Sequence, residues 1–270
     1  MTIEIHGAEG FAGMRKAGQL AAKILDHITP LICEGMTTNE IDQICSDIVA
    51  ENNAIAAPLN YHPKGFTYPF PKSVCTSVNE VICHGVPSDR KLKNGDIVNV
   101  DVTVIVDGWH GDSSRMYMVG NPSIKAKNLV STTYEAMMLG IEQVRPGATL
   151  GDIGHAIQSY VEKQGFSVVR DYCGHGIGKI FHTEPSVLHY GKAGTGTVLE
   201  EGMFFTIEPM VNQGNYKTRR DNRLIDDPIM YEWTIITSDL TLGKRSLSAQ
   251  FEHSIGVTKD GCEIFTQSAS

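Results

Sequence analysis

The sequence predicts an α+β fold in which two related halves pack around a central antiparallel sheet. A pair of amphipathic helices occurs twice along the chain, and a long hairpin of alternating residues lies between the two pairs. No stretch rich in proline and serine separates the halves. We therefore expect a single domain over residues 1–270, with halves at about residues 11–120 and 121–266 and a cleft between them.

The helix pairs carry the first sign of a repeat. Residues 15–53 are expected to form two helices that turn at Gly35, and Thr37 begins a capping-box signature before the second helix. The same features return later, because Gly147 follows Gly35 and Thr149 follows Thr37 at the same offset of 112 residues. Any two amphipathic helices can look alike, so the helices alone leave the relation of the halves open.

Residues 96–119 have the pattern of a strand hairpin. Valine occupies every second position from Val98 to Val106, which places the valines on one face of a strand. Asp107 and Gly108 then form a strong signal for a two-residue turn. The chain is expected to return antiparallel from this turn, with the valine face packed on a core.

The hairpin brings two carboxylates to the face opposite the valines. A two-residue turn pairs Thr103 with Asp112, which makes Asp101 and Asp112 diagonal neighbours at about 7–8 Å between Cα atoms. Either acid alone fits a solvated strand face. Two such acids repel each other unless a cation lies between them, and Asp is disfavoured in strands. A three-residue turn would separate them, so this hypothesis depends on the turn length.

Three later segments supply further candidate ligands. His175 lies among glycines, which allow close approach to the backbone. Glu208 interrupts an apolar strand that ends at Pro209, and an isolated carboxylate there is costly without a counter-charge. Glu252 lies in an alternating segment and points away from His253, which we expect to pack in the core. Four carboxylates match the charge of two divalent cations, and oxygen donors with one imidazole suit Mn, Fe, Co or Zn.

Composition narrows the function classes. The chain has 23 basic and 31 acidic residues and a net charge of −8, which argues against a general nucleic-acid binder. Its six cysteines include no C-x-x-C pair, a pattern typical of reduced cytosolic proteins. The sequence has no apparent signal peptide and no apolar run of the roughly 18 residues that a membrane span needs. We expect a cytoplasmic protein.

Five spaced motifs resemble those of the type I methionine aminopeptidases, a branch of the pita-bread metallopeptidases. They are NGDIVNVD (94–101), GDSSR (111–115), CGHGIG (173–178), FTIEP (205–209) and SAQFEH (248–253). The resemblance covers about residues 11–266. It implies the pita-bread fold with a dinuclear metal site and removal of the N-terminal Met from nascent proteins and peptides when the second residue is small. We expect type I rather than type II, because the sequence shows no cysteine-rich N-terminal extension and has no room for the large helical insertion of type II members.

The resemblance also implies roles for individual residues. The resemblance implies two divalent ions (Co, Mn, Fe or Zn), whose expected ligands are Asp101, Asp112, His175, Glu208 and Glu252. Of these, Asp112 and Glu252 are expected to bridge the two ions. The resemblance implies that His84 and His182 contact the substrate and stabilise the transition state, and that Glu208 also moves a proton. Candidates for the apolar methionine pocket are Tyr61, Cys75, Phe181 and Trp233. Ribosome association and a monomer are further expectations from the family.

The chain departs from the bacterial family pattern around the pocket. Pro58 stands where many members have Cys, Ser254 replaces the usual Thr, and insertions are expected near residues 63–70, 216–230 and 238–243. These changes leave fine specificity open. The alternatives are a proline-directed aminopeptidase or dipeptidase of the same fold, whose members usually carry an extra N-terminal domain, and a non-catalytic peptide-binding relative.

Overall fold

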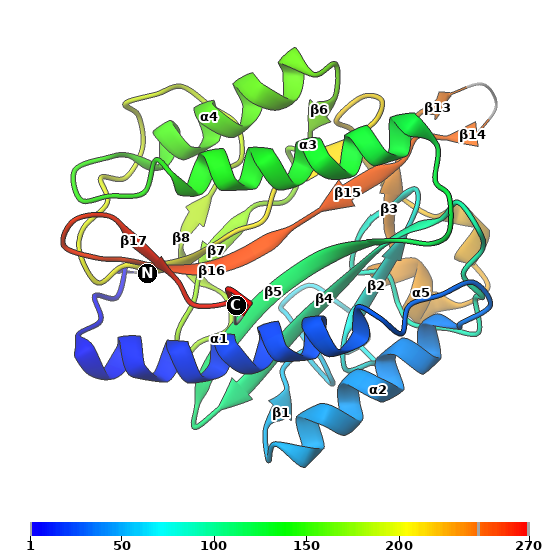
Figure 1. The fold of residues 1–270 in the computed structure, drawn as a ribbon, viewed down its shortest axis with the longest axis horizontal. Coiled ribbons are helices and arrows are strands. Elements are labelled where there is room, and N and C mark those ends of the chain that lie inside the picture. Colours follow the sequence, from blue (N-terminus) through cyan, green and yellow to red (C-terminus); the bar gives the residue numbers. More distant parts are fainter. Residues whose placement is uncertain (1, 242–243, 269–270) are drawn as a thin grey trace.

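The computed structural model describes residues 2–241 and 244–268 (Figure 1). The helical elements are α1 (Ala8–Ile28), α2 (Thr38–Glu51), α3 (Ile124–Ile141), α4 (Leu150–Lys163), α5 (Pro228–Trp233) and the 3₁₀ helix η1 (Asn222–Leu224). The strands of the first half are β1 (Ile55–Ala56), β2 (Cys75–Val78), β3 (Val81–Cys83), β4 (Ile97–Val106) and β5 (Trp109–Met118). The strands of the second half are β6 (Ser167–Val168), β7 (Gly174–Gly176), β8 (Thr183–Val187), β9 (Phe204–Ile207), β10 (Met210–Asn212), β11 (Thr218–Arg220), β12 (Ile235–Thr237), β13 (Leu240–Thr241), β14 (Lys244–Arg245), β15 (Ser248–Gln250), β16 (Glu252–Val257) and β17 (Cys262–Ile264).

One nine-stranded antiparallel sheet joins the two halves. Its order is β1-β4-β5-β16-β9-β7-β8, with β2 on β4 and β17 on β16. The halves meet where β5 pairs with β16, in the register Ser114 with Glu252 and Ser113 with His253. Residues from both halves can therefore project from one continuous surface.

The four long helices form two pairs, as the repeat predicts. In Figure 1, α3 and α4 lie in the upper part and α1 and α2 in the lower part, with the sheet strands between them. The second helix of each pair begins with a complete capping box, on Thr37 in α2 and on Thr149 in α4. Gly35 and Gly147 precede these caps with φ of +89° and +85°, values that favour glycine. The predicted α+β class, with two pseudo-symmetric halves about an antiparallel sheet, is confirmed.

Each helix pair packs on its own hydrophobic core. The valine face of β4 is buried against α1 and α2, with Val100 and Ile24 both fully inaccessible. The second core lies under α3 and α4 and includes Phe205 of β9 and Ile255 of β16. Because alternate strand residues point to opposite faces, burying these apolar residues directs their polar neighbours to the other side of the sheet.

The first helix begins earlier than the sequence predicted, at Ala8 rather than at Arg15. Gly10 and Gly13 weaken the helical signal there, because glycine has a low intrinsic helix propensity. Both positions lie against other side chains, and an added Cβ at Gly13 would collide with the indole of Trp109. Close packing of Gly10 and Gly13 therefore explains the first turn of α1, which local helix propensity alone does not favour.

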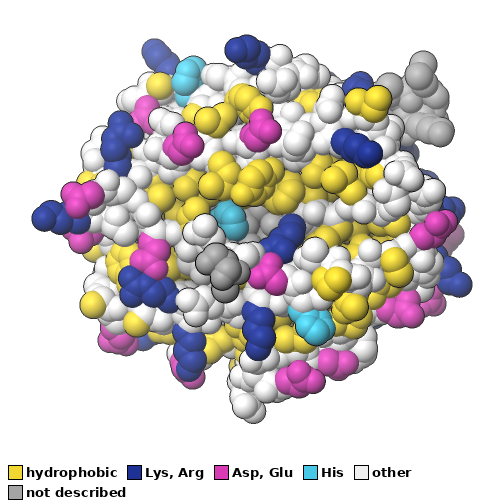
Figure 2. All heavy atoms as spheres, in the orientation of Figure 1, with side chains coloured by type: hydrophobic (Ala, Val, Ile, Leu, Met, Phe, Trp, Pro, Cys, Tyr) yellow, Lys and Arg dark blue, Asp and Glu magenta, His cyan; other side chains and the backbone are white. Residues whose placement is uncertain are grey.

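The surface of the molecule has a mixed charge on the face shown in Figure 2. Figure 2 shows positive and negative side chains interspersed around a hydrophobic band between the helix pairs, so this face carries no single-sign field. Among the described residues, no helix has both the length and the apolar character needed to cross a bilayer.

The expected insertion at 216–230 forms β11, η1 and the start of α5. Part of the insertion at 238–243 belongs to β13, and residues 242–243 lie outside the described residues.

Candidate active site

The β4–β5 hairpin has the register that the two-residue turn predicts. Val106 pairs with Trp109 and Thr103 pairs with Asp112. Asp107 and Gly108 both adopt positive φ, at +50° and +83°. The twist of such a turn matches that of the flanking strands, which explains why Asp-Gly at this point fixes the register.

The two hairpin carboxylates face the same cavity. Asp101 pairs with Ser114, one alternation along from the pair of Thr103 and Asp112. Both Asp101 and Asp112 line a cavity of about 380 Å³. The Thr103 hydroxyl donates to Asp112 Oδ1 at 2.7 Å. The other oxygen, Asp112 Oδ2, faces His175 and lies 3.5 Å from His175 Nε2.

His175 is held by its glycine neighbours and by a backbone hydrogen bond. An added Cβ at Gly176 would collide with the carbonyl oxygen of Glu184, and one at Gly174 would collide with that of Thr206. His175 Nδ1 lies 3.0 Å from the Gly176 carbonyl oxygen. Because a carbonyl only accepts, Nδ1 carries the proton, and Nε2 presents a lone pair to the cavity.

Two further carboxylates approach from the second half. Glu208 follows β9 and accepts a hydrogen bond from Thr206 Oγ1 at 2.7 Å and from Gln250 Nε2 at 3.3 Å. Its Oε1 lies 3.6 Å from His175 Nε2. Glu252, at the start of β16, is 2% exposed and lines the same cavity.

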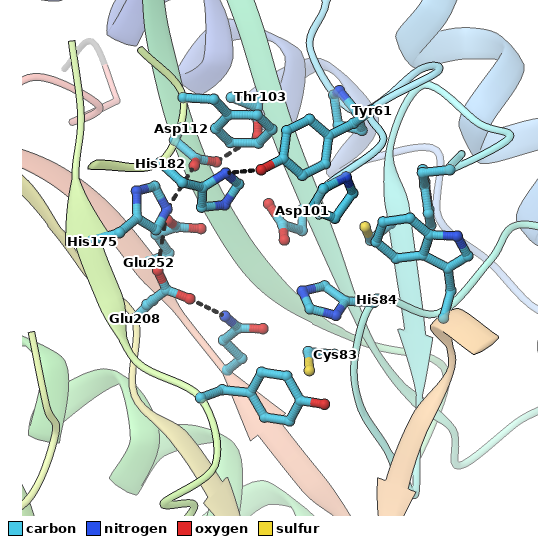
Figure 3. Close-up of a pocket in the computed structure, with 18 of the residues that line it drawn as sticks. Tyr61, Cys83, His84, Asp101, Thr103, Asp112, His175, His182, Glu208 and Glu252 are labelled. Carbon is cyan, nitrogen blue, oxygen red and sulfur yellow. Dashed lines mark hydrogen bonds and ion pairs between the residues drawn. The ribbon is translucent and has the colours of Figure 1, made fainter. Parts of the chain in front are cut away.

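These five side chains point toward a common space, as Figure 3 shows. One group of ligand atoms, from Asp112, His175 and Glu252, lies within 4.8 Å of one another. Asp101 and Glu208 line the same cavity outside that three-residue group. No Lys or Arg is among the residues that line the cavity in the described part of the chain.

Like charges in an enclosed space shift the pKa values of the acids. Burial, and then the neighbouring carboxylates, raise the pKa of Asp101 and of Glu252 well above their usual range. Burial raises the pKa of Glu208 to about 7, although His175 opposes the shift. Burial lowers the pKa of His175, but hydrogen bonding to Asp112 and attraction to Glu208 outweigh it, so the net shift is upward. Clustered carboxylates with one imidazole are the donor set of a divalent cation, so the residues fit the metal that the sequence predicts.

Two more histidines face the cavity. Tyr61 Oη lies 2.9 Å from His182 Nδ1, and the centroid of the His182 ring lies 4.2 Å from that of His175 and 4.0 Å from that of Phe181. His84 has a φ of +54° and faces Trp233 edge-on at 6.1 Å. Burial lowers the pKa of His182 to about 2 and that of His84 to about 4, so both rings are neutral at pH 7.

Two histidines outside the predicted set, His110 and His253, make contacts with neighbouring residues of the fold. His110 stacks on Phe181 with ring centroids 5.5 Å apart, and its Nδ1 donates to the Gly178 carbonyl at 2.9 Å. It does not line the described cavity. His253 is half-buried and its Nδ1 lies 2.8 Å from Thr266 Oγ1. Both arrangements are structural.

The cavity also has an apolar end, and more aromatic residues line it than the sequence predicted. All eleven predicted site residues line this one cavity, although their roles stay predictions. Phe66 and Phe70, from the insertion at residues 63–70, line it as well, together with Tyr172, Met210 and Gln250. Sequence reasoning missed Phe66 and Phe70, for which the only signal was a cluster of three aromatic residues in the insertion beside Tyr61.

The fold and the carboxylate cluster define the class of protein. The sequence profile of metallopeptidase family M24 matches residues 12–259. The chain therefore belongs to metallopeptidase family M24, and it contains a candidate metal-binding group.

Within that family, the chain is similar to proteins named methionine aminopeptidase. One from Rickettsia prowazekii is 59% identical over 268 residues, which cover 99% of this chain and 96% of the relative. The crystal structure of methionine aminopeptidase from Rickettsia prowazekii superposes with a TM-score of 0.90 at 58% identity, over 98% of this chain and 100% of that chain. The resemblance drawn from the five motifs is confirmed.

A prolidase has the same fold at much lower similarity. The prolidase from Pyrococcus furiosus matches with a TM-score of 0.73 at 21% identity, over 98% of this chain and 66% of that chain. Identity at this level shows a shared fold alone and carries no argument about the substrate.

Proposed function

We propose that this chain removes the N-terminal Met from nascent proteins and peptides whose second residue is small. The observation that carries the proposal is the single cavity in which an enclosed carboxylate cluster meets an apolar end lined by aromatic rings. The carboxylate cluster suits peptide hydrolysis with divalent cations, and the apolar end suits an unbranched thioether side chain. The names of the relatives from Rickettsia prowazekii support the same activity.

Five residues would hold two divalent cations, of Co, Mn, Fe or Zn. The proposed ligands are Asp101, Asp112, His175, Glu208 and Glu252. Bound cations would supply Lewis acidity, which polarises a peptide carbonyl and makes water more acidic. They would also neutralise the carboxylates, and the raised pKa values of Asp101 and Glu252 indicate how costly the uncompensated charges are.

The remaining polar groups have complementary parts in the hydrolysis. Glu208 is placed to accept the proton of the attacking water and pass it to the departing amine. If the Tyr61 hydroxyl donates to Nδ1 of His182, then Nε2 of His182 carries a proton that can be donated to the developing oxyanion. His84 would form a hydrogen bond with the amide of the bond that breaks. The low pKa values of both histidines keep their rings neutral at pH 7.

The proposal also covers the domain organisation, the cellular compartment and the oligomeric state. We infer a single domain that acts as a cytoplasmic monomer on nascent chains, with possible contact to the ribosome. Six free cysteines support a reducing compartment.

A peptide panel tests the proposed activity. The metal-loaded protein should release Met from Met-Ala-Ser, should stop when the metal is chelated, and should recover when Co, Mn, Fe or Zn is restored. A matched X-Pro peptide is the control for the proline-directed alternative. Equal turnover of the X-Pro peptide, or indifference to the chelator, would contradict the proposal.

A further inference from the structure

Residues 63–70, called here the aromatic loop, are anchored on α5 by one carboxylate. Glu232 accepts hydrogen bonds from the backbone N–H of Thr67 at 2.9 and 3.0 Å and from that of Tyr68 at 2.8 Å. The Glu232 side chain is buried, and both of its oxygens are used. Hydrogen bonds of this kind to an ionised group are among the stronger ones in proteins.

The next residue of α5 holds the same loop from its aromatic side. Trp233 Nε1 donates to the Tyr68 carbonyl at 3.0 Å. Its indole packs on Phe66 with ring centroids 4.2 Å apart and on Phe70 edge-on at 5.1 Å. Glu232 and Trp233 therefore fix a segment that lies about 165 positions away in the sequence.

The base of the loop is closed by its own backbone. The Phe70 N–H donates to the Tyr61 carbonyl at 2.9 Å, and the Asn60 N–H donates to the Phe70 carbonyl at 2.8 Å. The tip has one backbone hydrogen bond of its own, from the Phe66 N–H to the Pro63 carbonyl at 3.2 Å, and one side-chain bond, from His62 Nε2 to the Phe66 carbonyl at 2.8 Å. The tip therefore depends on Glu232 and Trp233 for its position over the cavity.

The loop supplies the wall of the apolar end. Pro63, Phe66 and Phe70 line the cavity beside Tyr61, whose hydroxyl contacts His182. In Figure 3, His84 lies on the opposite side of the pocket from His175 and Glu208, and the Tyr61 hydroxyl points toward His182. A side chain that enters this end meets aromatic rings, which favour a flexible thioether or n-alkyl chain and restrict bulky or branched ones.

We propose that Glu232 is a positioning residue that sets selectivity for the N-terminal side chain, by holding the aromatic loop so that Phe66 stays packed on Trp233. The inference rests on the proposed aminopeptidase function. Without the anchor, the loop must be ordered each time a substrate binds, and that ordering reduces affinity and weakens the restriction on shape. Glu232 itself does not line the cavity, so it acts through the loop that it holds.

Two glutamate variants and one control test the role. Glu232→Ala should raise KM for Met-Ala-Ser about tenfold, equivalent to about 1.4 kcal/mol, with kcat within about twofold. The preference for Met-Ala-Ser over Phe-Ala-Ser should fall by a similar factor. Glu232→Gln keeps one acceptor oxygen and should restore part of both effects. Glu201→Ala removes the same charge from an exposed site and should match the parent protein.

Phe66→Ala provides a second route to the same question. It keeps the carboxylate anchor and removes one wall, so it should reproduce the loss of preference for Met over Phe, with metal content unchanged. If Glu232→Ala fails to fold, Glu232→Gln and Phe66→Ala decide together. Unchanged selectivity in Phe66→Ala, or a Glu232→Ala protein that loses kcat while its KM and selectivity stay constant, would overturn the inference. Absence of Met-Ala-Ser turnover in the parent protein would instead refute the proposed function.

Discussion

The hydrogen bond from Thr103 to Asp112 gives a direct test of how the centre is organised. Thr103→Val has nearly the same shape but removes the hydroxyl that holds Asp112 Oδ1 at 2.7 Å. The loss frees the carboxylate to rotate away from His175, whose Nε2 lies 3.5 Å from Oδ2. It also leaves a buried oxygen without its donor, because Asp112 is 3% exposed.

The expected magnitude follows from the type of bond. A hydrogen bond to a charged group contributes about 1.5–3 kcal/mol. Partners that orient a metal ligand typically change metal affinity by about 10–100-fold. We therefore expect Thr103→Val to weaken Mn²⁺ binding by about tenfold or more. The metal-free protein should also melt several degrees lower, at about 2–4 °C per kcal/mol for a chain of this size.

The assay is calorimetric titration of Mn²⁺ into the metal-free protein, with thermal unfolding measured in parallel. Thr133→Val is the matched control, because its buried hydroxyl donates to the Leu129 carbonyl at 2.7 Å within α3. The control should lower Tm and leave the Kd for Mn²⁺ unchanged. A Kd in Thr103→Val that stays within twofold of the parent, or that changes equally in both variants, would refute the reasoning.

Three other predictions concern the same centre. Asp101→Asn should abolish both turnover and stoichiometric metal uptake, measured by elemental analysis, and full activity would remove Asp101 from the ligand set. Gly176→Ala should reduce metal uptake and lower Tm because the new Cβ meets a backbone carbonyl, whereas Gly261→Ala, with open space around it, should change neither. The contribution of Glu208 to the stability of the metal-free protein should fall as pH rises from about 4.5 through 7, because the folded-state pKa of Glu208 is raised to about 7 and the folded state binds the extra proton. Thermal unfolding against pH checks this when the parent protein is compared with Glu208→Gln, which cannot titrate at this position.

The site was predictable where it depends on local geometry. The valine alternation and the Asp107-Gly108 turn fix the hairpin register within a few residues of the acids, so the shared face of Asp101 and Asp112 follows from the sequence. The hypothesis that two helix pairs are related also depends on local signals, namely capping boxes that have a recognisable sequence signature.

The parts that escaped prediction depend on contacts between distant segments. The start of α1 is set by packing of Gly13 on Trp109, which outweighs the poor helix propensity of its glycines. The aromatic loop carries no periodic pattern, and its position depends on Glu232 and Trp233, which follow it by about 165 residues. The sequence placed Trp233 in the pocket through a family resemblance, but no local rule connects it with Phe66.

The two halves of the sheet also explain why the centre costs stability before a cation binds. Burial of Val100 on one face of β4 and of Phe205 in β9 fixes strands whose opposite faces carry Asp101 and Glu208. The cores therefore force like charges together, and the raised pKa values of Asp101 and Glu208 are consequences of desolvation and of the neighbouring carboxylates. Hydrophobic burial in each half exceeds this cost, because a single apolar side chain contributes about 1.5–3 kcal/mol and each core contains many. A cation that neutralises the cluster recovers part of that energy, so metal binding and folding stability should be coupled in this protein.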